Sequence, residues 1–97
     1  MVEELTKQEL APPTERPLNT LHPNDRGEVV RLTVEGEQRR RLMDLGLLPG
    51  TTVSVEFRSP LGDPTSYRIR GALIALRDVQ ARQVIVRRLD DDGSTTR

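Results

Sequence analysis

The chain has 97 residues, of which 31% are charged, 34% hydrophobic and 2% aromatic, and its formal net charge is zero. This length allows one domain, whose core must be built from Val, Leu and Ile rather than from aromatic side chains. The lack of cysteine excludes disulfides and thiolate metal sites, and zero net charge gives no general attraction to nucleic acid. No apolar run approaches the roughly 20 residues that span a bilayer. We therefore expect a soluble cytoplasmic protein that is not inserted in a membrane.

Residues 1–24 are predicted to be a flexible, proline-containing N-terminal extension. Prolines lie here among polar residues, and the few apolar side chains show no sustained period. Too little apolar surface is present to offset the entropy of ordering the chain. A segment that becomes ordered on a partner is the alternative. His22, the only histidine, lies in this extension, and we expect it to be solvated rather than a metal ligand.

A strand and a helix are predicted next. Residues 28–34 alternate in the manner of a strand, with Val30, Leu32 and Val34 on the face expected to be buried. The helix is predicted from Glu37 to Leu45, where leucines three residues apart share one face.

The end of this helix is marked by glycine and proline. Gly46 can adopt the left-handed conformation that ends a helix at little cost. Pro49 prevents the helix from resuming because it lacks an amide hydrogen. Pro49 and Gly50 together suit the two central positions of a type II turn.

A second strand is predicted from Thr51 to Arg58, because Val53, Val55 and Phe57 alternate with polar residues. Phe57 and Tyr67 are both expected to fill the core rather than to form an aromatic peptide-binding groove. The turn Ser59–Pro64 follows, rich in residues that restrict or free the backbone.

The rest of the chain is predicted to form further short elements and a polar tail. These are strands at 66–70, 73–76 and 84–88, a helical turn at 78–83, and the tail at 90–97. Five short strands with one inserted helix predict a mainly β fold, a small twisted barrel over residues 25–89.

The motifs LMDLGLLPGT, SPLGDP, YRIRG, ALIALR and VIV, in this order between Arg26 and Leu89, resemble the FeoA family. Two separate motifs carry the resemblance, Leu45–Gly50 and Ser59–Pro64; either alone would be a common loop pattern. FeoA proteins are small cytosolic partners of the bacterial ferrous iron transport system. The resemblance implies an SH3-like five-stranded barrel with one α-helix inserted after the first strand.

The resemblance also implies a function. Members associate with FeoB, a membrane permease that bears a cytoplasmic G-protein domain, to support or regulate Fe(II) uptake. We expect a non-catalytic accessory protein that needs no cofactor and reaches the inner face of the membrane through this partner; weak self-association stays open. A similar domain occurs in some iron-dependent repressors, so a stand-alone relative of that domain is an alternative.

Apolar side chains on the two turns are the candidate partner-binding residues, because a rigid turn loses little entropy when its side chains are buried against a partner. These residues are Leu47, Leu48, Pro49 and Leu61. One of the two adjacent leucines is expected to fill the end of the barrel instead. The glycines and prolines of both turns are expected to serve the backbone first.

No metal site is predicted. Fe(II) sites are usually made from convergent histidine, carboxylate or cysteine side chains, and this chain has one histidine and no cysteine. Its densest acids, Asp90–Asp92, are adjacent rather than alternating and lack the glutamate that closes a calcium loop. A solvated tail is the better interpretation of these aspartates.

Nucleic-acid binding is the alternative from another class, because arginines are frequent in the C-terminal half. They are Arg68, Arg70, Arg77, Arg82, Arg87 and Arg88. Zero net charge and the scarcity of aromatic residues argue against it, so no nucleic-acid partner is expected. An enzyme is not expected either, since the residues of no catalytic set can be assembled. Arg39–Arg41 is typical of a solvated helix face, with an arginine donated to the FeoB GTPase as the alternative.

Overall fold

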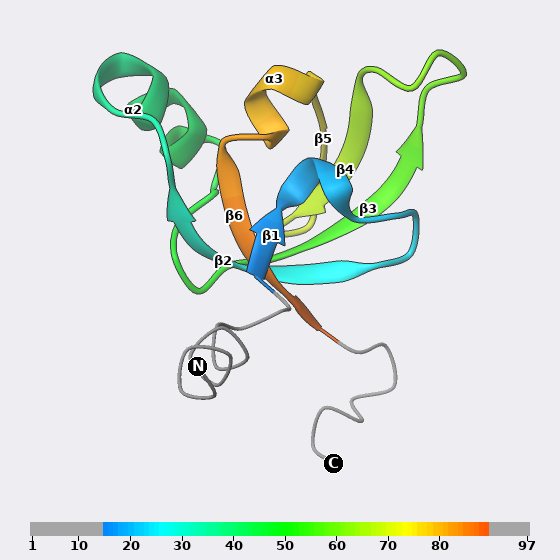
Figure 1. Ribbon diagram of the computed structural model, residues 1–97, viewed down its shortest axis with the longest axis horizontal. Coiled ribbons are helices and arrows are strands. Elements are labelled where there is room, and N and C mark those ends of the chain that lie inside the picture. Colours follow the sequence, from blue (N-terminus) through cyan, green and yellow to red (C-terminus); the bar gives the residue numbers. More distant parts are fainter. Residues whose placement is uncertain (1–14, 90–97) are drawn as a thin grey trace, which may run out of the picture.

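The computed structural model describes residues 15–89 (Figure 1). The predicted polar tail at 90–97 and the first part of the predicted extension, residues 1–14, lie outside the described residues. Six strands form one antiparallel sheet in the order β1-β6-β2-β3-β4-β5. The elements are β1 (Glu15–Pro17), the 3-10 helix η1 (Leu18–Thr20), β2 (Arg26–Leu32), α2 (Gly36–Asp44), β3 (Thr52–Arg58), β4 (Thr65–Ile69), β5 (Ala72–Leu76), α3 (Asp78–Ala81) and β6 (Val84–Leu89).

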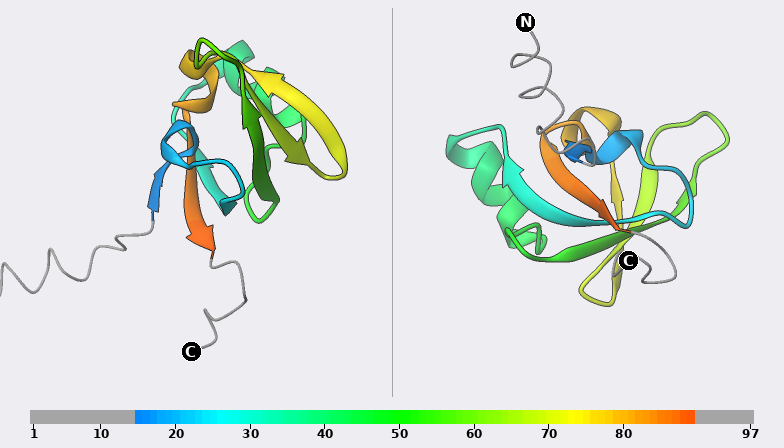
Figure 2. Two further views of the ribbon diagram at one scale, coloured as in Figure 1. Left: turned by 90° about the vertical axis from the view of Figure 1, so that its right-hand side faces the viewer. Right: turned by 60° about the horizontal axis from the view of Figure 1, so that its bottom comes forward.

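The sheet coils around a core of aliphatic side chains and one tyrosine. Figure 1 shows α2 at one end of the sheet and α3 at the top beside η1, and Figure 2 shows how strongly the sheet curves. The Asn19 amide of η1 donates a 2.9 Å hydrogen bond to the Asp78 carboxylate of α3, which ties these two short helices together. The predicted mainly β fold with one inserted helix is therefore confirmed.

The N-terminal boundary of the domain differs from the prediction. β1 pairs with β6, from Glu15 opposite Arg87 to Pro17 opposite Ile85. Leu18 and Leu21 are 0% and 1% exposed and belong to the core. The interpretation of residues 15–24 as a flexible extension, and the count of five strands, are therefore wrong. Leucines that each cover the core from an irregular segment leave no periodic signal in the sequence.

The segment from residue 21 to 25 is fixed by hydrogen bonds to the sheet. The Arg58 guanidinium donates to the Leu21 carbonyl oxygen. The Asn24 N–H donates to the Val55 carbonyl at 2.8 Å, and the Val55 N–H donates to the Asp25 carbonyl at 3.0 Å. This loop is thus joined to β3 as an irregular continuation of the sheet.

Two register shifts change which side chains are buried. In β2 the pairing with β6 shifts between Val29 and Arg31, which is a β-bulge. Val29 is therefore buried, and the predicted inward position of Val30 is wrong. Leu32 is buried as predicted, and Val34 is partly buried and packs against the core.

In β3 a similar shift lies between Val55 and Phe57. Val53 and Val55 are buried as predicted, but Phe57 is 54% exposed. The bulge moves Phe57 to the outer face, since a slip of one residue exchanges the two faces of a strand. The prediction that Phe57 fills the core is wrong, whereas Tyr67, 1% exposed, does so.

The predicted turn chemistry is confirmed. Helix α2 ends within one residue of the predicted position, and Gly46 has a φ of +102°. The Thr51 N–H donates to the Leu48 carbonyl at 2.9 Å across Pro49 and Gly50, and Gly50 has a φ of +94°. Both glycines therefore occupy conformations that side chains disfavour.

Gly27 of β2 allows close packing, and Gly27→Ala is expected to lower the free energy of unfolding by about 1–3 kcal/mol. An added Cβ would lie 2.9 Å from Cγ2 of Val86, which is fully buried and has no room to move. Urea unfolding measures the loss, with the neighbouring, partly exposed Glu28→Ala as the control expected within about 0.5 kcal/mol of wild type. Equal stability of the two variants would contradict this packing.

Candidate interaction surfaces

The first candidate residue, Leu47, belongs to the core. Its side chain is 0% exposed, so it has no surface to offer a partner, and its prediction as a partner-binding residue is wrong. The expectation that one of the two adjacent leucines fills the interior holds for Leu47. Sequence alone did not decide between Leu47 and Leu48, because both follow the helix-ending glycine.

Leu48 and Pro49 form the corner between α2 and β3. Leu48 is partly buried and Pro49 is exposed. The Gly50 N–H donates to the Val29 carbonyl of β2 at 2.8 Å, and the Leu48 N–H donates to the Gly46 carbonyl at 2.8 Å. The corner is thus held on both sides, and its apolar atoms are displayed on a fixed backbone.

Leu61 is the most exposed large apolar side chain of the described residues, at 93%. It lies on the turn between β3 and β4. The Ser59 N–H donates to the Pro64 carbonyl at 3.1 Å, and the Gly62 N–H donates to the Ser59 carbonyl at 2.8 Å. The Asp63 carboxylate accepts a 2.9 Å hydrogen bond from the Asp78 N–H, which anchors the turn to α3.

The structure does not bring these candidates into one patch. The corner at Leu48 and Pro49 precedes β3, and Leu61 follows it. β3 has seven residues, which at about 3.3 Å per residue separates its ends by roughly 20 Å. Figure 1 shows the two turns at opposite ends of the strand. They are therefore two separate candidate surfaces.

A third surface escaped the sequence analysis. On the outer face of β3, β4 and β5, Phe57 lies opposite Ser66, which lies opposite Ala75, and Arg68 lies opposite Leu73. Phe57 and Leu73 are 54% and 49% exposed. The bulge that exposes Phe57 leaves no sequence signal, and the uninterrupted apolar run ALIAL does not reveal which side chains face outward.

Acids compensate some of the basic residues of this fold. Five arginines form ion pairs in the described part of the chain: Arg31–Glu15, Arg68–Glu56, Arg82–Asp78, Arg87–Glu28 and Arg88–Asp25, at 3.2–3.5 Å. Such pairs add little stability at a surface. They do reduce the positive potential that binding to a phosphate backbone requires.

Ionisable groups near the loop and core are shifted by identifiable contacts. A hydrogen bond from the His22 N–H, with a further contribution from Arg88, lowers the pKa of Asp25. The hydrogen bond from Asn19, followed by that from Arg82, lowers the pKa of Asp78. Burial raises the pKa of the Tyr67 hydroxyl. The two carboxylates act as structural hydrogen-bond acceptors between segments, and Tyr67 is a core residue.

No metal-binding constellation lies within residues 15–89, where His, Asp and Glu nowhere gather in a group of three or more. The His22 side chain is 77% exposed, with Nδ1 3.8 Å from the Asp25 carboxylate. Asp90–Asp92 lie outside the described residues. None of the helices in the described part of the chain is both long and apolar enough to cross a membrane.

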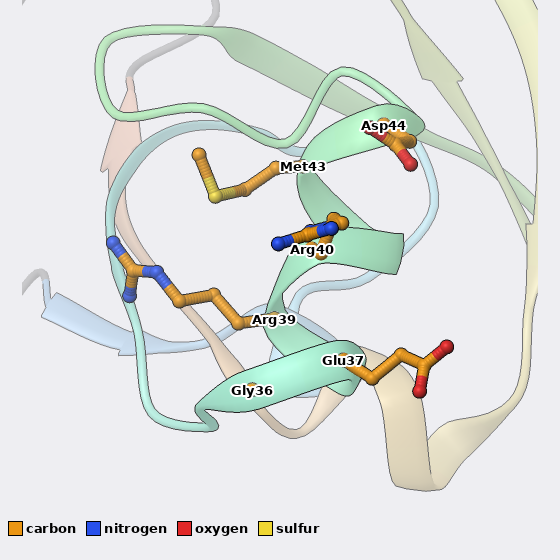
Figure 3. A pocket seen from close by; sticks show the side chains of 6 residues that line it. All are labelled: Gly36, Glu37, Arg39, Arg40, Met43 and Asp44. Atoms are coloured by element: carbon orange, nitrogen blue, oxygen red, sulfur yellow. The ribbon is translucent and has the colours of Figure 1, made fainter.

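A hollow of about 710 Å³ lies along helix α2. It is lined by Gly36, Glu37, Arg39, Arg40, Met43 and Asp44. Figure 3 shows the Arg39 and Met43 side chains on one side of the helix and Glu37 and Asp44 on the other. Side chains of one helix that point apart do not form a ligand site, so Arg39–Arg41 remains an exposed helix face.

Comparisons with known proteins agree with this fold. The family model of the FeoA domain matches residues 16–88. The Fe(2+) transport protein A/Fe(2+) transporter FeoB fusion protein of Porphyromonas gingivalis is 30% identical over 79 residues, which cover 81% of this chain and 9% of the relative. The chain thus spans less than a tenth of that protein.

Solved structures are similar along most of the described chain. The FeoA protein of Chlorobium tepidum is 39% identical, with a TM-score of 0.71 over 76% of this chain and 70% of that chain. FeoA of Stenotrophomonas maltophilia in complex with zinc, a prokaryotic SH3 domain protein, is 23% identical, with a TM-score of 0.66 over 76% of this chain and 95% of that chain.

A manganese-dependent transcriptional repressor shares the fold, with a TM-score of 0.72 at 22% identity over 82% of this chain and 44% of that chain. The fold is therefore SH3-like, as the resemblance implied, with six strands instead of five. The family match spans the sheet from β1 to β6, including the segment before residue 25. The chain belongs to the FeoA family.

Proposed function

We propose that this chain is a non-catalytic accessory protein of ferrous iron uptake that binds a cytoplasmic part of a FeoB-like permease. The observation that carries this proposal is the relative in which FeoA and FeoB segments share one polypeptide. A covalent link holds two modules at a high effective concentration, which is useful when the modules act on each other. When FeoA and FeoB are separate chains, their contact depends on their affinity, and thus on a binding surface. The protein then works in the cytoplasm, at the inner face of the membrane.

The binding energy comes from apolar side chains on fixed turns. Leu61 is the first candidate, because it is 93% exposed on a turn that backbone hydrogen bonds and α3 hold in place. Leu48 and Pro49 form the second surface at the other end of β3. Burial of a side chain whose backbone is already ordered costs little further entropy. A permease that contacts both turns would span the length of β3.

The effect on transport is a shift of the conformational balance of the permease. Binding can change this balance only by as much as the affinities for the two conformations differ. Nucleic-acid binding is not favoured, since five arginines pair with acids and Phe57 is the one exposed aromatic side chain among the described residues. The formal net charge of zero also argues against nucleic-acid binding.

Ferrous iron uptake in cells that lack this chain tests the proposal. Wild-type protein is expected to restore the uptake rate, whereas Leu61→Ser is expected to bind the permease at least tenfold more weakly and to restore it poorly. A leucine that anchors an interface is worth about 1–2 kcal/mol or more. Leu48→Ser is expected to act in the same direction and to weaken permease binding less, because Leu48 is already partly buried.

The matched control is Leu73→Ser, which removes an exposed leucine of β5, away from both turns. It is expected to restore uptake as wild type does. Uptake that is the same with and without the chain would overturn the proposed function. Normal uptake and wild-type permease binding by the Leu61→Ser and Leu48→Ser variants would overturn only the assignment of the two turns.

A further inference from the structure

The sheet formed by residues 15–89 has two edge strands, β1 and β5, and only one of them is protected. β1 is short and carries Glu15, Arg16 and Pro17, features that discourage pairing with another chain. β5 consists of Ala72-Leu73-Ile74-Ala75-Leu76, without charge or proline. An apolar, unprotected edge of this kind is a template for a further strand.

The hairpin that leads into β5 determines which backbone groups are available. Arg70 and Gly71 both have positive φ, +52° and +87°, as in a type I′ turn of two residues. Ile69 and Ala72, which flank this turn, are opposite each other and form a hydrogen-bonded pair. Since the pattern alternates along the strand, the N–H and C=O of Leu73 and Ala75 point away from β4. These two residues offer the free edge.

We propose that β5 pairs antiparallel with β5 of a second copy of this chain, with Ile74 opposite Ile74. In this register Leu73 of each copy lies opposite Ala75 of the other, so the outward-pointing groups of both residues form hydrogen-bonded pairs. Leu76 lies opposite Ala72, so that each large side chain beside the central Ile74 pair meets a small one. The two sheets then continue across the dimer axis.

Other antiparallel registers match the side chains of β5 less well. Antiparallel registers that keep the same hydrogen-bonding groups differ by two residues along the strand. One of them places Leu73 opposite Arg77, and the other places Leu73 opposite Leu73. Only the register centred on Ile74 places each leucine of β5 opposite an alanine of the other copy, which favours a second copy over an unrelated peptide.

Site-specific crosslinking tests the register directly, because the chain has no cysteine of its own. The Cα atoms of a pair without mutual hydrogen bonds are about 4.5 Å apart, within the range of a disulfide. Ile74→Cys is therefore expected to form a covalent dimer when a thiol oxidant is added to purified protein. Ala72→Cys is the control, because its two copies are offset by four residues, roughly 13 Å. Equal crosslinking of both variants, or of neither, would overturn the register.

Sedimentation of the purified chain without the permease tests the dimer itself. We expect a weak dimer that forms as the concentration rises, since a single strand pair buries a small area. Leu73→Lys is expected to raise the dissociation constant at least tenfold, because it adds like charges at the edge. Phe57→Lys, on the same outer face but on β3, is expected to change it less than twofold. Equal weakening by both variants, or a wild-type chain that stays monomeric at about 1 mM, would overturn the proposal.

Discussion

Leu18→Ala is expected to lower the free energy of unfolding by about 2–5 kcal/mol. Leu18 lies in η1, is 0% exposed and belongs to the same core cluster as Val84 and Val86. Truncation removes the transfer free energy of the buried atoms and leaves a cavity that the surrounding strands only partly fill. A domain of this size has a total stability of only about 5–15 kcal/mol, so the variant should unfold at markedly lower temperature and denaturant concentration.

Urea unfolding followed by circular dichroism measures this loss. His22→Ala is the control from the same segment, because its side chain is 77% exposed and its removal should change stability by less than about 0.5 kcal/mol. If Leu18→Ala were as stable as wild type, the N-terminal segment would not be part of the folded domain. The boundary at residue 25 expected from the sequence would then be restored.

Leu47→Ser is expected to destabilise the fold strongly and Leu61→Ser hardly at all, although both replace a leucine of a turn motif. Leu47 is 0% exposed, so its replacement by serine loses about 2–5 kcal/mol of packing, and a buried hydroxyl without a partner costs about 1–3 kcal/mol more. Leu61 is 93% exposed, and its replacement should leave stability within about 0.5 kcal/mol of wild type.

Thermal and urea unfolding of the two variants make this comparison before any binding assay. Loss of permease binding by Leu47→Ser would reflect unfolding, whereas loss of binding by Leu61→Ser would reflect a missing contact. A stable Leu47→Ser variant would contradict the burial of this side chain and would return Leu47 to the set of candidate contacts.

Local chain chemistry determines the parts of the fold that the sequence predicts well. The end of α2 at Gly46 and the turn at Pro49 and Gly50 depend on the conformations that these residue types allow, and the structure has them where expected. β4 is similar, because Tyr67 and Ile69 alternate with polar residues and are both buried. In each case the signal lies within a few residues.

Features that depend on distant segments escape the sequence. The bulges near Val29 and Val55 arise from how β2 and β3 pair with other strands, so the faces of Val30 and Phe57 could not be read from alternation alone. Leu18 and Leu21 reach the core from an irregular segment without a period. The candidate site was predicted as a set of turn residues, but their burial and the length of β3 between them are tertiary properties.

Physical association with a permease is the basis of the proposed function. The most direct measurement is affinity purification of the tagged chain, expressed at its natural level, from detergent-solubilised native membranes. We predict that a FeoB-like permease co-elutes with the wild-type chain and is depleted at least tenfold with Leu61→Ser, while Leu73→Ser retains it. A folded wild-type chain that elutes without the permease would contradict the account.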